Sequence, residues 1–124
     1  MVGTYNEALR LQAAAAAAVH EAGLDETFVT LDGMHTGPTL DAGVHVVLIT
    51  PPRVETEGIT AIENTTWTVY AISAEIEDPA DYWPLLDRLD DVLSTTFEPE
   101  RTEFVTWRTS GGLEYPARQI TFTT

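Results

Sequence analysis

A three-to-four-residue repeat of apolar positions opens the chain and predicts a first helix. Thr4 and Glu7 have the spacing of a capping box, in which each side chain satisfies a backbone donor of the first turn. Good helix formers continue to Ala22, and Gly23 stands where a left-handed residue ends a helix. One face carries small residues, which let a helix approach its neighbour closely. This face either packs against the chain's own sheet or, in part, meets a neighbouring subunit.

A second helix is predicted from Asp78 to about Thr96. Asp78 is a good N-cap residue, and Pro79 fits the first helical position because its missing N–H needs no partner there. An apolar stripe with helical spacing follows, made of Tyr82, Leu85, Leu86, Leu89, Val92 and Leu93. The charged residues Asp87, Arg88, Asp90 and Asp91 are expected on the opposite, solvent-facing side.

Strands are predicted where the repeat shortens to two residues, over 27–31, 44–50, 65–76, 103–109 and 113–124. Pro51-Pro52 ends the second strand, since proline donates no ladder hydrogen bond. The turn Ser110-Gly111-Gly112 makes the last two strands a hairpin, and Pro116 suggests an edge strand or a bulge. The glycine- and proline-containing segment 34–43 is predicted to be a loop.

The polar segment Arg53–Asn64 fits either a long loop or an extended two-stranded arm. The two helices and five strands give the order α-β-β-β-α-β-β. We therefore predict one α+β domain over residues 1–124, in which two helices pack on a mostly antiparallel sheet.

Charge and composition restrict the function. The chain has 20 acidic and 6 basic residues, a net charge of −14, and no cysteine. All basic residues are arginines, so lysine chemistry, thiol chemistry and cysteine–metal sites are excluded. With so few cations we expect no tight nucleic-acid binding, because such binding neutralises many phosphates. We also expect neither a signal peptide nor a membrane span.

Candidate catalytic groups form no recognised pattern. The histidines His20, His35 and His45 lack metal-ligand spacing, and the carboxylate clusters are expected to be solvated faces, with bridging of subunits by divalent ions as the alternative. The tryptophans fall inside regular elements and are expected in the core. We predict no catalytic residues, no metal and no cofactor.

Several phrases resemble the tail terminator (tail completion, minor tail) proteins of long-tailed bacteriophages, and the resemblance spans nearly the whole chain. It rests on the alanine-rich first helix and on four segments: Val44–Ile49, Thr66–Ile72, Asp78–Trp83 with the leucines that follow, and Tyr115–Phe122. The pattern belongs to a diverse family without a fixed signature.

The resemblance implies a structural virion protein of the tail or neck that assembles in the host cytoplasm. Its copies would form a homo-oligomeric ring, a hexamer, that caps the tail tube protein and ends its polymerisation. The ring would join the tail to head–tail connector or neck proteins, with DNA passing through the lumen without specific binding. It implies no enzymatic activity and no membrane partner.

Inter-subunit or tube contacts are expected in the two segments without a clear period and at two arginines. The candidates are Met34, His35, Thr36, Arg53, Val54, Glu55, Thr56, Glu57, Arg108 and Arg118. Two other classes remain open: another neck or connector ring subunit, and a small acidic α+β ligand-binding or enzymatic domain.

Overall fold

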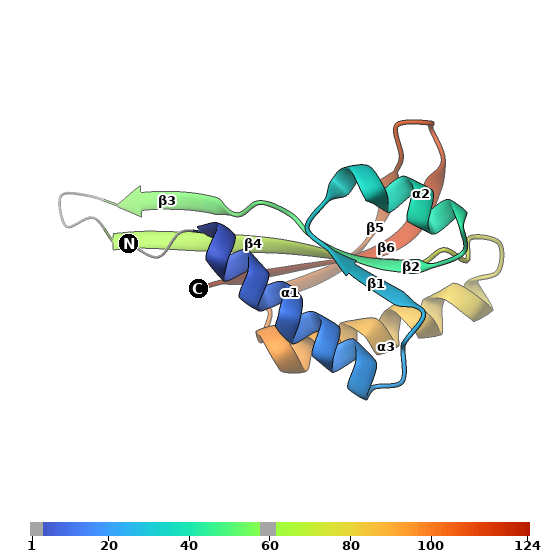
Figure 1. Ribbon diagram of the computed structural model, residues 1–124, viewed down its shortest axis with the longest axis horizontal. Helices are drawn as coiled ribbons and strands as arrows, with labels where there is room; N and C mark the ends of the chain where they lie inside the picture. The colour runs from blue at the N-terminus through green and yellow to red at the C-terminus, as the bar shows by residue number, and fades with distance from the viewer. Residues whose placement is uncertain (1–3, 58–61) are drawn as a thin grey trace.

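The computed structural model describes residues 4–57 and 62–124 (Figure 1). The elements in these ranges are α1 (Thr4–Glu21), β1 (Thr27–Thr30), the 3₁₀ turn η1 (Gly33–His35), α2 (Thr36–Asp41), β2 (His45–Ile49), β3 (Arg53–Glu57), β4 (Ile62–Ile72), α3 (Pro79–Phe97), β5 (Arg101–Arg108) and β6 (Glu114–Thr123). The fold is α+β, as predicted.

The strands form one mixed, mostly antiparallel sheet. In the described chain the order is β1-β2-β4-β6-β5, and β3 also pairs with β4. Only the β1–β2 pairing is parallel among these strands. β1 and β2 can run parallel because η1 and α2 lie between them in the chain and return it to the end of the sheet where β1 begins.

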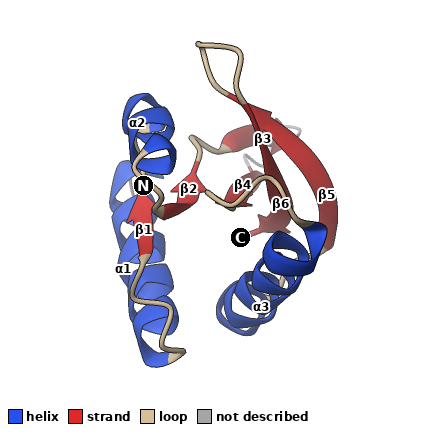
Figure 2. Cartoon of the chain, turned by 90° about the vertical axis from the view of Figure 1, so that its right-hand side faces the viewer, coloured by secondary structure: helices blue, strands red, loops and turns tan. Residues whose placement is uncertain are grey.

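Two apolar cores lie on opposite faces of the sheet. On one face α1 and α3 bury Val47, Trp67, Val69 and Ile120. On the other face, Leu40 of α2 packs with a smaller set made of Val46, Leu48, Ile72, Tyr115 and Ala117. In Figure 2, α3 lies below the curved sheet and α2 above it. The central strand β4 therefore contributes side chains to both cores, with the larger core on the side of α1 and α3.

The predicted second helix is α3, and its local signals are confirmed. The Asp78 carboxylate accepts a hydrogen bond from the Ala80 N–H at 2.9 Å. Leu86, Leu89 and Leu93 of the apolar stripe are fully buried. At the end of α1, Gly23 has a φ of +75°, the left-handed conformation that its position predicts.

The prediction of two helices is wrong, because α2 forms within the segment predicted as a loop. Gly37 and Pro38 usually interrupt helices. Here Pro38 lies in the first turn of α2, where its missing N–H costs no helical hydrogen bond. Leu40, 2% exposed, provides the burial that stabilises this short helix.

Two strand predictions are also corrected. The third strand ends at Ile72 rather than residue 76, because the Ser73 hydroxyl and Glu75 backbone form a turn. Pro116 does not mark an edge, since β6 lies between β4 and β5. The Pro116 carbonyl accepts a hydrogen bond from the Ser73 N–H, one residue beyond the end of β4. Proline has no N–H, but at this position the β4–β6 ladder has already ended, so no ladder hydrogen bond is lost.

The described residues of the segment Arg53–Asn64 adopt the second of its predicted alternatives, the two-stranded arm, and residues 58–61 lie outside the described part of the chain. Strand β3 pairs with the beginning of β4, in the register Arg53↔Thr66 to Glu57↔Ile62. The later residues of β4 pair with β2 instead. Figure 1 shows the arm extending beyond the helices that cover the body of the sheet.

Replacement of Leu89 by alanine is expected to lower the free energy of unfolding by about 2–5 kcal/mol, because it leaves a cavity between α3 and the sheet. The matched control is Leu113→Ala at the β5–β6 turn, where leucine is 51% exposed and truncation changes stability by about 0.5 kcal/mol at most. Urea unfolding measures both values. Equal losses for the two variants would contradict the placement of α3.

Candidate interaction surfaces

The base of the arm carries two of the predicted contact residues. Arg53 begins β3 and is exposed, and the Val54 residue is 45% exposed. The backbones of Glu55, Thr56 and Glu57 continue β3. The side chains of those three residues lie outside the described part of the structure, so their predicted contacts stay predictions.

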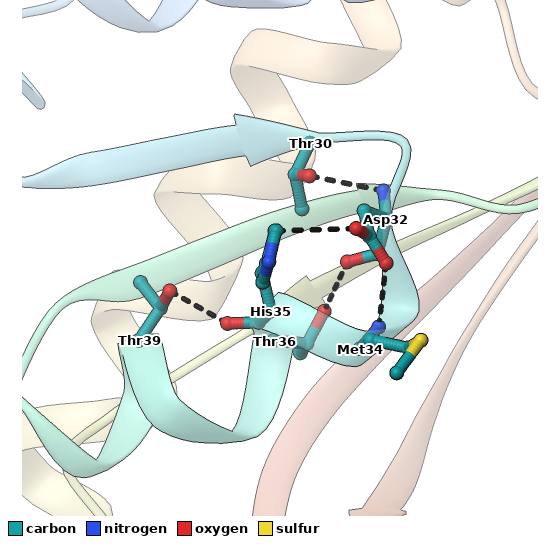
Figure 3. A network of polar contacts seen from close by, with 6 residues as sticks. All are labelled: Thr30, Asp32, Met34, His35, Thr36 and Thr39. Carbon is teal, nitrogen blue, oxygen red and sulfur yellow. Dashed lines mark hydrogen bonds and ion pairs between the residues drawn. The ribbon is translucent and has the colours of Figure 1, made fainter.

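The second predicted contact segment is a compact polar turn (Figure 3). Asp32 organises it: one carboxylate oxygen accepts from the Met34 N–H at 2.8 Å, and the other lies 3.2 Å from His35 Nδ1. Met34 is 85% exposed and is therefore available to a partner. Thr36 is fully buried, and its hydroxyl donates to the Asp32 carbonyl at 3.3 Å, so its role is to hold the turn.

The two predicted arginines differ in their surroundings. Arg108 is exposed at the end of β5 and pairs with Glu114 across the hairpin. The Arg118 side chain is only 16% exposed and pairs with Asp87 at 3.0 Å and Asp90 at 3.1 Å. Arg118 therefore joins β6 to α3 within the protomer. The prediction that Asp90 faces solvent is wrong, because it is 9% exposed in this pairing.

An exposed aromatic pair lies beside Arg118, at the edge of the sheet formed by β5. The rings of Trp83 and Phe104 have centroids 4.8 Å apart, and the Arg118 guanidinium lies 4.2 Å from the centre of the Phe104 ring. Trp83 is 52% exposed and Phe104 is 44% exposed. Phe104 is thus held between Trp83 and a cation that α3 anchors. We call Trp83 and Phe104 the aromatic pair.

This surface differs from the prediction, which places the tryptophans in the core. That assignment holds for Trp67, which is fully buried. A signal for Trp83 was present in the sequence. Residue 83 lies outside the apolar stripe of α3, so its indole had no place in the core that the stripe forms.

A shallow apolar pocket lies at the base of the arm, where the first turn of α1 meets the end of β2. It has a volume of about 230 Å³, and Tyr5, Ala8, Ile49, Pro51 and Pro52 are among its lining residues. Ile49 is buried, whereas Tyr5 is 68% exposed at the rim. We call this cavity the proline pocket. It lies toward the β1–β2 side of the sheet, and the aromatic pair lies on the β5 side.

The charge of the molecule is distributed unevenly. Residues 101–124 contain three arginines and two glutamates, which gives a net charge of +1. The whole chain has a net charge of −14, so residues 1–100 carry −15. Arg101 and Arg108, at the two ends of β5, are both well exposed. Each of the three arginines of this segment is paired with a carboxylate: Arg101 with Glu103, Arg108 with Glu114, and Arg118 with Asp87 and Asp90.

The histidines are separate from one another and have local partners. His20 Nδ1 lies 2.6 Å from Asp25, and His35 lies near Asp32. His45 Nδ1 accepts the Ala74 N–H at 3.0 Å, and burial lowers the pKa of His45. Within residues 4–57 and 62–124, no group of three or more potential ligands could hold a metal ion.

Comparisons with known proteins add no family to this description. No protein-family model matches the chain, and no curated protein sequence matches it. Of the helices in the described ranges, none has the length and apolar character needed to cross a membrane.

One part-buried polar contact joins α2 to the sheet and makes stability depend on pH. The Tyr115 hydroxyl donates a hydrogen bond to the Asp41 carboxylate, and the tyrosine is 5% exposed. This hydrogen bond, with burial, raises the pKa of Tyr115 to about 12 from its ordinary value of 10.0. The stabilisation is therefore complete below pH 10 and is lost as the pH rises through 12.

Tyr115→Phe is expected to reduce stability by about 1–2 kcal/mol at neutral pH, because the Asp41 carboxylate loses its donor. The stability difference from the wild type should shrink as the pH rises from 10 to 12. Urea unfolding over that range measures the difference. Tyr5→Phe, at an exposed position, is the matched control with no expected change. A difference that stayed constant to pH 12 would contradict the Tyr115–Asp41 coupling.

Proposed function

We propose that this protein is a structural component of a phage virion, a tail terminator whose copies form a six-membered ring. The ring caps the tail tube, ends polymerisation of the tube protein and provides the surface that joins the tail to the neck and head. This function is mechanical, so the surfaces of the subunit and their charge perform it rather than a reactive side chain.

The β3–β4 arm is the observation that carries the proposal. It is a hydrogen-bonded extension of the central strand that reaches past the helices (Figure 1). It gives the subunit reach, which suits a protein that must contact both its neighbours and the end of a tube.

The charge of the chain suits the proposed passage of DNA. Proteins gain affinity for DNA when their cations replace the counterions of the phosphates. A subunit with a net charge of −14 offers few such cations, and carboxylates facing a lumen repel the phosphates. DNA would therefore slide through the ring without being retained.

The same charge opposes assembly, so ring formation is expected to depend on ionic strength. At about 0.01 M salt the screening length is about 30 Å, and repulsion between subunits extends across their whole contact region; at about 0.15 M it falls to about 8 Å. We expect subunits of 13.6 kDa at low salt and rings of six copies after addition of salt or magnesium.

Light scattering with negative-stain imaging tests this expectation. Sodium chloride at the ionic strength of the magnesium buffer is the control that separates screening from bridging by a divalent ion. A molecular mass that stays at one copy under every condition would overturn the proposed ring.

Shortening the arm tests its role in capping. A variant in which Asn-Gly replaces residues 55–64 joins Val54 to Thr65, which are paired across the arm. The two-residue turn matches this pairing, so the body of the sheet should fold with an unchanged melting temperature. In a phage that carries this variant as its only copy, we expect overlong tails in electron micrographs. Tails of normal length would contradict the proposed function of the arm.

A further inference from the structure

A histidine side chain takes the place of a strand partner beyond the end of β4. The pairing of β2 with β4 ends at Val46↔Ile72. Two residues past that end, the Ala74 N–H donates a hydrogen bond to Nδ1 of His45, the first residue of β2, at 3.0 Å. This side chain therefore fixes the beginning of the connection from β4 to α3, residues 73–78.

The hydrogen bond to Ala74 requires the neutral imidazole. An imidazole nitrogen accepts a hydrogen bond only while it carries no proton, and an imidazolium has two donors and no acceptor. The other histidines differ, because His20 Nδ1 lies 2.6 Å from a carboxylate oxygen of Asp25. His35 Nδ1 lies 3.2 Å from Asp32. A carboxylate only accepts, so a proton on Nδ1 suits both of those contacts, whereas it breaks the contact of His45.

We propose that His45 is an acid-sensitive latch on the connection between β4 and α3. The neutral imidazole holds residues 73–78 to β2, and a proton taken up from solvent at Nδ1 releases the Ala74 N–H. The inference does not depend on the proposed ring, since every group in it belongs to one copy of the chain.

Three carboxylates surround His45 and attract the imidazolium away from Ala74. His45 lines an open cavity of about 400 Å³, which Glu75 enters from the connection and Asp81 from α3. Glu26, which directly precedes β1, adds its charge from the β1 side of the sheet. The cavity gives the protonated ring both room to turn and acceptors for its two N–H groups.

Burial opposes protonation and sets the pH range of the latch. Desolvation lowers the pKa of His45 below its ordinary value of 6.5, although the carboxylates of Glu26 and Glu75 oppose this shift. The folded chain therefore binds the proton less readily than the unfolded chain does. The stabilisation by neutral His45 is complete above pH 6.5 and is lost as the pH falls through the lower pKa of the folded state.

Opening of the latch is expected to be local, because the connection is held separately at both ends. The Ser73 N–H donates to the Pro116 carbonyl at 3.0 Å, without any part for His45. Further along the chain, the fully buried Leu86 and Leu89 hold α3 against the sheet. Loss of the Ala74 hydrogen bond therefore loosens the segment between two fixed points and leaves the body of the fold intact.

Nitrogen NMR of the isotope-labelled imidazole rings tests the neutral state of the latch. At about pH 7.5 we expect His45 to carry its proton on Nε2 and to leave Nδ1 without one. This is the tautomer in which Nδ1 accepts from Ala74. A proton on Nδ1 of His45 at that pH would overturn the latch.

Amide hydrogen exchange tests the release. Between about pH 7.5 and about pH 5, the protection of the Ala74 amide, corrected for its intrinsic exchange rate, should fall by about tenfold as His45 becomes protonated, as for the loss of one hydrogen bond. The neighbouring Ser73 amide, bonded to Pro116, is the internal control and should keep its protection. Protection of Ala74 that persists after His45 is protonated would contradict the release.

Two variants separate His45 from the carboxylates around it. In His45→Asn the side-chain oxygen accepts near the position of Nδ1 and does not titrate, so Ala74 should stay protected over the whole pH range. In His45→Leu the acceptor is absent, so protection of Ala74 should be lost even at about pH 7.5. If His45→Asn loses protection with acid as the wild type does, the surrounding carboxylates cause the effect and the role of His45 is overturned.

Circular dichroism checks the fold of each variant. If His45→Leu does not fold, the wild-type titration and His45→Asn still decide the inference. All these measurements report on groups within one copy of the chain. A chain that never forms rings would therefore overturn the proposed function and leave the latch standing, and an Ala74 amide that ignores the protonation of His45 would do the reverse.

Discussion

Strand β4 is the constraint on which the rest of the molecule depends. Its later residues pair with β2 on one side and β6 on the other, and their side chains enter both apolar cores. Its first residues pair with β3 and form the arm. One strand thus belongs to the rigid body and to the extension, so the direction of the arm is fixed by the packing of Trp67 and Val69 beneath the helices.

Pro51 and Pro52 divide the strand that runs beside β4 into two parts. They interrupt the ladder between β2 and β3, because proline provides no N–H. The same two residues form part of the rim of the proline pocket. A break that ends the body of the sheet therefore also creates the cavity at its edge, and the arm begins at the next residue.

At the opposite edge, Arg118 connects packing to surface chemistry. Its pairing with Asp87 and Asp90 joins β6 to α3, and its guanidinium lies against Phe104. In a chain with few cations, a mostly buried arginine that neutralises two carboxylates of α3 keeps that helix against the sheet. The exposed aromatic pair is ordered as a consequence.

The sequence by itself determined α1 and α3, the cap at Asp78, the final hairpin and the mostly antiparallel sheet, because these depend on residues close together in the chain. It left the arm as one of two alternatives, since a polar segment without a period has no local preference. It assigned α2 to a loop, placed Asp90 in solvent and placed Trp83 in the core. Only the tertiary structure decided these: burial of Leu40 stabilises a short helix with poor propensity, Arg118 arrives from 28 residues further along the chain, and Trp83 packs against Phe104 of β5 at the surface. Each outcome depends on a partner distant in sequence, which a local pattern does not contain.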